Sequence, residues 1–349
     1  MDEHDILAIM LKQWLQRAQP FLVVVSLVLI GVLLRSQWAE LQAHTWRLHA
    51  GWLGASAIFM GATWLVEVSL WRRLLVVVGG QLPFAAAWRI WFLTALVRYV
   101  PGNIWQPLSM TLYCERRGIR PEATLMSMVL YQAVTMLAVA PIAGIYLLLY
   151  NREGLLSQLL ASLTPWLGAV GLIPILIFVV RPALLMNLVN WALEKVGRPA
   201  LAAQLTSRTL LSLLLVGMVS WLLWGAAFAT LTFALRPYQN GELLRLVGPL
   251  VAVFSVGYAV GFLSLLTPSG FGVREGAYYL LLIPLLDGAT VAVAALAMRV
   301  WIIVGEVVVA TVALFWKTGA EEIPVATPPY PGSGSYAQPY GVTSEPQPE

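Results

Sequence analysis

The residues with the clearest chemical potential are an adjacent arginine and glutamate, Arg274 and Glu275, which lie in the stretch TPSGFGVREG at residues 267–276. Strongly apolar runs flank this stretch on both sides, so we expect it at or near membrane depth. Lipid cannot hydrogen-bond free backbone N–H and C=O groups, and irregular backbone there must be buried in protein or line a water-filled cavity. A broken helix with a charge pair at its restart is typical of a substrate path through a membrane.

The second half of the break predicts an anion-binding geometry. Pro268 and Gly270 interrupt the helix, and a new half-helix is expected to begin near Gly272. Its first N–H groups, together with Arg274, would favour an anion such as a lipid phosphate. The alternative is that Glu275 only neutralises its neighbour at a helix start.

A comparable break occurs earlier, in the stretch RYVPGNIW at residues 98–105, which contains Arg98, Pro101, Gly102 and Asn103. Proline removes a backbone donor and clashes with the preceding turn, and glycine then permits an unusual backbone angle. We therefore expect a helix that enters the membrane, breaks and returns. The same site residues are the candidate walls of a lipid headgroup pathway.

Three further charges fall inside apolar runs, namely Glu67, Arg299 and Glu306. A charge in mid-membrane costs at least about 2.5–3.5 kcal/mol on insertion scales, so such residues are usually paired and face the protein interior. Arg299 and Glu306 are seven residues apart, which places them on one helix face. They either extend a charge network around Glu275 or form a structural pair, and Glu67 and Arg98 could instead snorkel to an interface.

The composition excludes several classes of function. Of 349 residues, 59% are hydrophobic and 11% are charged, against about 25% charged in ordinary soluble domains. We read the net charge of +4 as a membrane topology signal and not as nucleic-acid binding. Cys114 is the sole cysteine, and His4, His44 and His49 lack ligand spacing, so we expect no metal site and no cofactor. Tryptophans near the ends of apolar runs, such as Trp71, are expected to anchor the chain at the interface.

The elements that position these residues are apolar runs of about the length needed to cross a bilayer, roughly 20 residues. The prediction is an all-α polytopic integral membrane protein with about seven to eight transmembrane helices and two broken or re-entrant segments. Residues 1–19 are expected to form an interfacial amphipathic helix, 20–316 the transmembrane domain, and 317–349 a disordered tail rich in Pro, Gly and Ser. The expected spans are 20–34, 50–70, 122–149, 164–180, 209–235, 246–266 and 289–316, with shorter runs at 84–99 and 273–286 and a loop at 181–208.

Basic residues in the predicted loops indicate an orientation with a cytoplasmic N-terminus. Both breaks would then open from the cytoplasmic side, and the side of the tail depends on whether residues 273–286 cross or turn back. The loops predicted inside contain Lys12, Arg17, Arg72, Arg73, Arg116, Arg117, Arg120, Arg181, Lys195, Arg198 and Arg208, and those predicted outside contain Arg35, Arg47, Arg152, Arg236 and Arg245.

The two breaks resemble the two signatures of the lysylphosphatidylglycerol synthase transmembrane-region family, whose members are also called flippase-like domain proteins. The first signature is RYVPGNIW followed by RRGI at 116–119, and the second is the Pro-x-Gly-x-Gly-x-Arg-Glu-Gly pattern that ends at Gly276. The resemblance covers roughly residues 20–316. In the best-known relatives a soluble C-terminal domain makes the aminoacylated lipid, and we expect no such transferase domain beside the short tail of this sequence.

The resemblance implies a flippase-like protein of the cell membrane that moves an anionic, aminoacylated or glycosylated lipid between leaflets. Two alternatives stay open: an intramembrane enzyme with Glu275 or Glu67 as general base, and an accessory scaffold for lipid-linked envelope or glycan synthesis. The expected partners are membrane lipids, with a second copy of the chain or an envelope-synthesis protein as further options.

Overall fold

The computed structural model describes residues 35, 48–95, 105–149, 164–195, 199–200, 203–264 and 272–315. The predicted interfacial helix at 1–19, the first predicted span at 20–34 and the tail at 317–349 lie outside the described residues.

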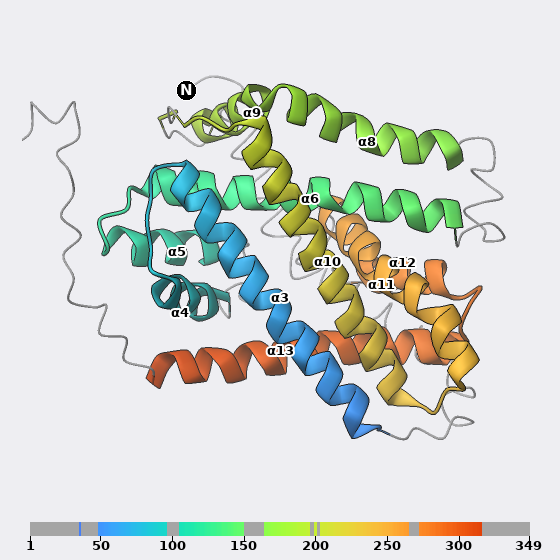
Figure 1. Cartoon of the computed structure of the whole chain (residues 1–349). Helices are drawn as coiled ribbons and strands as arrows, with labels where there is room; N and C mark the ends of the chain where they lie inside the picture. The colour runs from blue at the N-terminus through green and yellow to red at the C-terminus, as the bar shows by residue number, and fades with distance from the viewer. Residues whose placement is uncertain are drawn as a thin grey trace, which may run out of the picture.

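All regular structure in this part of the chain is helical, which confirms the predicted all-α class (Figure 1). Ten helices are present there: α3 (Ala50–Val77), α4 (Phe84–Ala95), α5 (Trp105–Glu115), α6 (Pro121–Leu149), α8 (Thr164–Val180), α9 (Pro182–Lys195), α10 (Ser207–Leu235), α11 (Asn240–Leu263), α12 (Val273–Leu282) and α13 (Gly288–Phe315).

Five of the described helices, α3, α6, α10, α11 and α13, are long and apolar enough to cross a membrane. The number rises to six if α8 and α9, which meet at a bend of 99°, are taken as one span. With the predicted span at 20–34 outside the described residues, the expected seven to eight spans are an approximate count. The polytopic character is confirmed.

Helices α3 and α10 form the antiparallel centre of the bundle and cross in front of α6 and α13 in Figure 1. The backbone N–H of His49 donates to Ala234 at 3.0 Å, and the Ser56 hydroxyl donates to the Ala227 carbonyl at 2.8 Å. A buried serine bonded to a carbonyl of the neighbouring helix satisfies a polar group that lipid could not. These contacts set α3 against α10 with opposite directions.

One end of the bundle is marked by the start of α3 and the end of α10. The α10–α11 connection lies there, and its Arg236 is 3.9 Å from Asp287, just before α13. Near the end of α6, the Tyr146 hydroxyl donates to the Leu281 carbonyl of α12 at 2.7 Å. The end of α12 and the start of α13 are therefore at this same end, which we call the Arg236 end.

Helices α11 and α12 form a hairpin that enters from the Arg236 end and returns to it. The rings of Phe254 and Tyr278 stack at 6.0 Å, and Arg274 lies over Tyr258, so α12 runs back along α11. The sequence left open whether residues 273–286 cross or turn back. In the structure α12 returns toward the Arg236 end, and α13 then crosses to the opposite end. The expectation that both breaks open from the cytoplasmic side stays a prediction.

Helices α4 and α5 form the corresponding broken segment at the opposite end, next to the end of α3 and the start of α6. Trp91 of α4 packs against Trp71 of α3 at 5.8 Å and against Tyr131 of α6 at 5.2 Å. The predicted break lies between the two short helices, as expected, although residues 96–104 are outside the described residues. Two broken segments are thus confirmed, and they enter from opposite ends.

Cys114 lies near the end of α5 and is fully buried. Burial raises the pKa of its thiol to about 11, so at pH 7.5 the reactive thiolate is scarce. We expect N-ethylmaleimide to leave the folded protein unlabelled and to label it once after SDS unfolding, which mass spectrometry can count. Rapid labelling of the folded protein would contradict the burial. The same inertness allows added cysteines to be labelled selectively.

Candidate functional site

The candidate site begins where α12 restarts after the second break. Gly272 has a φ of 79°, in the left-handed region, and α12 begins at Val273. The Gly272 N–H donates to the Glu275 carboxylate at 2.7 Å. This bond satisfies one of the helix-start donors, and a negative charge there also faces the positive end of the helix dipole. The predicted start of the half-helix near Gly272 is confirmed.

The other oxygen of the Glu275 carboxylate contacts Arg299 of α13, with Nη1 and Oε1 3.2 Å apart. Glu275 is 4% exposed and the Arg299 side chain 18%. Arg299 is eleven residues from the start of α13 and sixteen from its end, which places the pair deep in the span at about 1.5 Å per residue. The structure therefore brings the second break into contact with one of the intramembrane charges singled out by the sequence.

Arg274, on the same turn of α12, lies over the ring of Tyr258 of α11, with its guanidinium carbon 4.3 Å from the ring centroid. A cation over an aromatic face at this distance is attracted by the ring quadrupole. Tyr278, one turn further along α12, fills the space beside Gly257, where a Cβ would collide with its ring. These contacts on α11 fix the direction in which α12 leaves the break.

Glu67 of α3 accepts a hydrogen bond from the Trp224 indole nitrogen of α10 at 2.9 Å. The Trp224 ring stacks on Phe254 at 5.7 Å, and Phe254 stacks on Tyr278. A continuous series of aromatic rings thus connects Glu67 with α12. Sequence reasoning did not single out Trp224 or Tyr258, since nothing in their local spacing marks them as partners of a charge.

Glu306 of α13 is 3% exposed and lies seven residues after Arg299. A Cβ on its neighbour Gly305 would be 2.6 Å from the ends of both the Met60 and Trp64 side chains of α3, so the glycine leaves room for these side chains. The low exposure of Glu306 indicates that its carboxylate lies inside the bundle and out of lipid.

The family described as lysylphosphatidylglycerol synthase TM region matches residues 21–313. The chain belongs to this family. No curated protein matches the chain. Within the family's match lie both broken segments and all three intramembrane charges, Glu67, Arg299 and Glu306.

Most residues of the first break and the beginning of the second are not among the described residues. Arg98, Pro101, Gly102, Asn103, Pro268 and Gly270 lie outside the described residues and stay predictions. Of the site residues proposed from sequence, the described ones are Gly272, Arg274, Glu275, Glu67, Arg299 and Glu306. Gly272, Arg274 and Glu275 lie together at the start of α12, and of these Glu275 contacts Arg299.

The described part of this family member contains no group of three or more His, Cys, Asp and Glu residues that could hold a metal ion. The charged groups at its centre are carboxylates and guanidinium groups. Such groups can bind and release an anion or a cation through charge-assisted hydrogen bonds.

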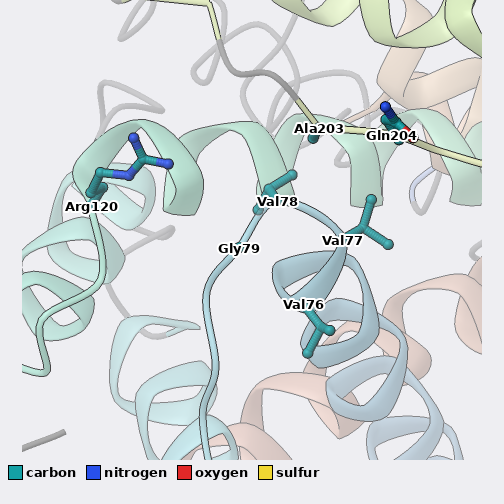
Figure 2. A pocket seen from close by; sticks show the side chains of 7 residues that line it. All are labelled: Val76, Val77, Val78, Gly79, Arg120, Ala203 and Gln204. Carbon is teal, nitrogen blue, oxygen red and sulfur yellow. The ribbon is translucent and has the colours of Figure 1, made fainter. Parts of the chain in front are cut away.

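A hollow of about 220 Å³ lies away from this centre, at the end opposite the Arg236 end (Figure 2). It is bounded by Val77 at the end of α3, by Gly79 in the turn that follows, by Arg120 before α6, and by Gln204 before α10. Only Arg120 contributes a charge, and the helix end that lines the hollow presents backbone carbonyls, which do not attract anions. We therefore place the candidate site at Glu275 and Arg299.

Gly272 and Gly276 provide a matched test of the break in this family member. Gly272→Ala puts a side chain at a positive φ, which costs roughly 1–2 kcal/mol, and should lower the apparent melting temperature in detergent. Gly276→Ala meets nothing within 4 Å and has no positive φ, so its melting temperature should not fall. Equal melting temperatures for the two variants would contradict the geometry at Gly272.

Proposed function

We propose that this protein moves an anionic, aminoacylated or glycosylated lipid between the leaflets of the cell membrane. The observation that carries the proposal is the buried Glu275–Arg299 pair at the start of a helix that turns back inside the bundle. A charge pair at this depth is costly to insert and is usually tied to a substrate path. A lipid headgroup is the substrate that the family suggests.

The pair also suggests how an anion would be bound. The Glu275 carboxylate occupies the place that a phosphate would take, because it accepts from a helix-start N–H and lies beside Arg299. A lipid phosphate entering the site would exchange with this carboxylate and bind Arg299 and Arg274 through charge-assisted hydrogen bonds. The acyl chains would stay in lipid throughout.

The opposite directions of the two hairpins support alternating access to such a site. The α11–α12 hairpin enters from the Arg236 end, and the α4–α5 segment from the other. Movement of either one would open the centre toward one leaflet, and in known transporters discontinuous helices form the substrate site around which access alternates. Arg98, Pro101, Gly102 and Asn103 would face the headgroup from one hairpin, and Pro268, Gly270 and Gly272 from the other.

The orientation we propose places the end opposite the Arg236 end in the cytoplasm, together with the N-terminus. The end of α3, the α5–α6 connection and the start of α10 all carry arginines there, and cytoplasmic loops are enriched in Lys and Arg. Helix α13 ends on the same side, so the segment after Phe315 would also begin in the cytoplasm. The described basic residues at this end are Arg72, Arg73, Arg116, Arg117, Arg120, Arg181, Lys195 and Arg208.

Reconstitution tests the proposal directly. The purified protein is placed in liposomes that contain labelled anionic, aminoacylated or glycosylated lipids, and loss of label to a membrane-impermeant reductant reports movement between leaflets. We expect movement with the wild type and none above empty vesicles with Arg274→Ala or with Glu275→Gln plus Arg299→Gln. Arg236→Gln is the matched control, since it removes an ion pair at the bundle end.

Two results would overturn this function. Wild-type liposomes that move no lipid of the panel faster than empty vesicles would exclude a flippase. A new lipid product found by mass spectrometry, lost in Glu67→Gln, would indicate an intramembrane enzyme in which Glu67 acts as general base. Glu275 suits that role less well, because both of its carboxylate oxygens are already engaged.

A further inference from the structure

Helix α9 follows α8 after a single residue and turns away from it by 99°. The sequence predicts a loop at 181–208, and this prediction is wrong for Pro182–Lys195, which is helical. Proline at the first helical position has a suitable φ and loses no needed hydrogen bond. If α8 crosses the membrane, a helix at a right angle to it lies in the membrane plane, at the end of the bundle where α10 begins (Figure 1).

The side chains of α9 divide into three faces. One face packs into the protein core and consists of Leu185, Met186, Val189 and Leu193. A second face carries the polar residues Asn187 and Glu194. The third is an exposed apolar stripe with the spacing of one helix side, formed by Leu184, Leu188 and Trp191, which are 42%, 51% and 57% exposed. We call it the α9 stripe.

A helix that only packed on the bundle would need one apolar face, and α9 has two. The α9 stripe leaves about half of each of its side chains uncovered by the described part of the chain, so water would be an unfavourable environment for it. Basic side chains flank α9 at both ends: Arg181 directly precedes it and is exposed, and the Lys195 ammonium lies 6.0 Å from the centre of the Trp191 ring. Apolar stripe, tryptophan and flanking cations are the pattern of a helix that binds an anionic membrane surface.

We infer that α9 is an in-plane helix whose stripe of Leu184, Leu188 and Trp191 is immersed in the adjacent leaflet, with Lys195 and Arg181 bound to anionic phospholipid headgroups. Asn187 and Glu194 then face water, and the third side holds α9 against the bundle. The helix ties the α8–α10 connection to the membrane surface. This binding surface is distinct from the Glu275–Arg299 site and does not depend on lipid transport.

Spin labels on single cysteines test the immersion in nanodiscs that each hold one copy of the protein, so that a second copy cannot cover the stripe. Labels at Leu188→Cys and Trp191→Cys should collide with oxygen, which concentrates in lipid, and be protected from a water-soluble nickel chelate. Labels at the matched positions, Asn187→Cys and Glu194→Cys, should show the reverse. Equal chelate accessibility at all four positions would overturn the inference.

The preference for anionic lipid has its own readout. In nanodiscs of mixed phosphatidylglycerol and phosphatidylcholine, bromine on the acyl chains of one lipid at a time quenches nearby tryptophan. The Trp191 signal, taken as wild type minus Trp191→Phe, should be quenched more by brominated phosphatidylglycerol than by brominated phosphatidylcholine. Arg181→Gln plus Lys195→Gln should abolish the difference. Equal quenching in the wild type would overturn the anionic preference.

Discussion

Replacing Arg299 with glutamine is expected to destabilise the protein strongly and to abolish lipid movement. The change leaves the Glu275 carboxylate 4% exposed and without its guanidinium partner. Removing one member of a buried ion pair costs about 3–5 kcal/mol, because the other charge stays buried. The apparent melting temperature in detergent should therefore fall well below that of the wild type.

Glu275→Gln tests the other member of the ion pair. Glutamine keeps an oxygen that can accept from the Gly272 N–H, so the start of α12 should be retained while the charge is lost. The double variant Glu275→Gln plus Arg299→Gln removes both charges and should be more stable than the sum of the single losses predicts. Strictly additive losses would show that the two side chains do not interact.

The double variant separates folding from function. If it melts near the wild type but moves no lipid, the charges serve the headgroup path and not only the fold. If it melts near the wild type and still moves lipid, the pair is structural and the proposed exchange with phosphate is wrong.

The long helices were predictable because membrane insertion leaves a strong local signal. Runs of apolar residues located α10 and α13 to within a few residues. The helix ends predicted at Pro101 with Gly102 and at Pro268 with Gly270 lie outside the described residues. Helix α9 was missed because its polar, apolar and basic residues alternate around three faces. Such a segment has no continuous apolar run, so its hydropathy pattern predicts a loop.

The partners within the site could not be predicted, because they depend on which helices pack together. Glu275 and Arg299 are on different helices, and the sequence offered Glu306 equally well as the partner of Arg299. Trp71 illustrates the same difficulty. Its place near an apolar run's end predicted an interfacial anchor, yet it is fully buried and its indole N–H donates to Ser127 at 3.0 Å. The interfacial role was wrong for this residue.

Among glycine-to-alanine replacements in the described part of the chain, Gly225→Ala is expected to lower stability the most. Gly225 lies on α10 where α11 crosses it, and an added Cβ would come within 2.7 Å of both the Cα and the carbonyl carbon of Val251. Backbone atoms cannot rotate away as a side chain can, so the two helices would have to separate.

Separation at this crossing would also displace the site. Phe254, one turn beyond Val251, stacks on both Trp224 and Tyr278, and these rings hold Glu67 and α12 in place. We expect Gly225→Ala to lower the apparent melting temperature sharply and to reduce lipid movement even in the fraction that folds.

Gly61→Ala is the matched control, since its helical position has nothing within 4 Å. Because alanine favours helix more than glycine does, Gly61→Ala should leave the melting temperature unchanged or slightly raised. A fall in melting temperature of the same size in both variants would mean that the loss comes from the helix backbone and not from the α10–α11 contact.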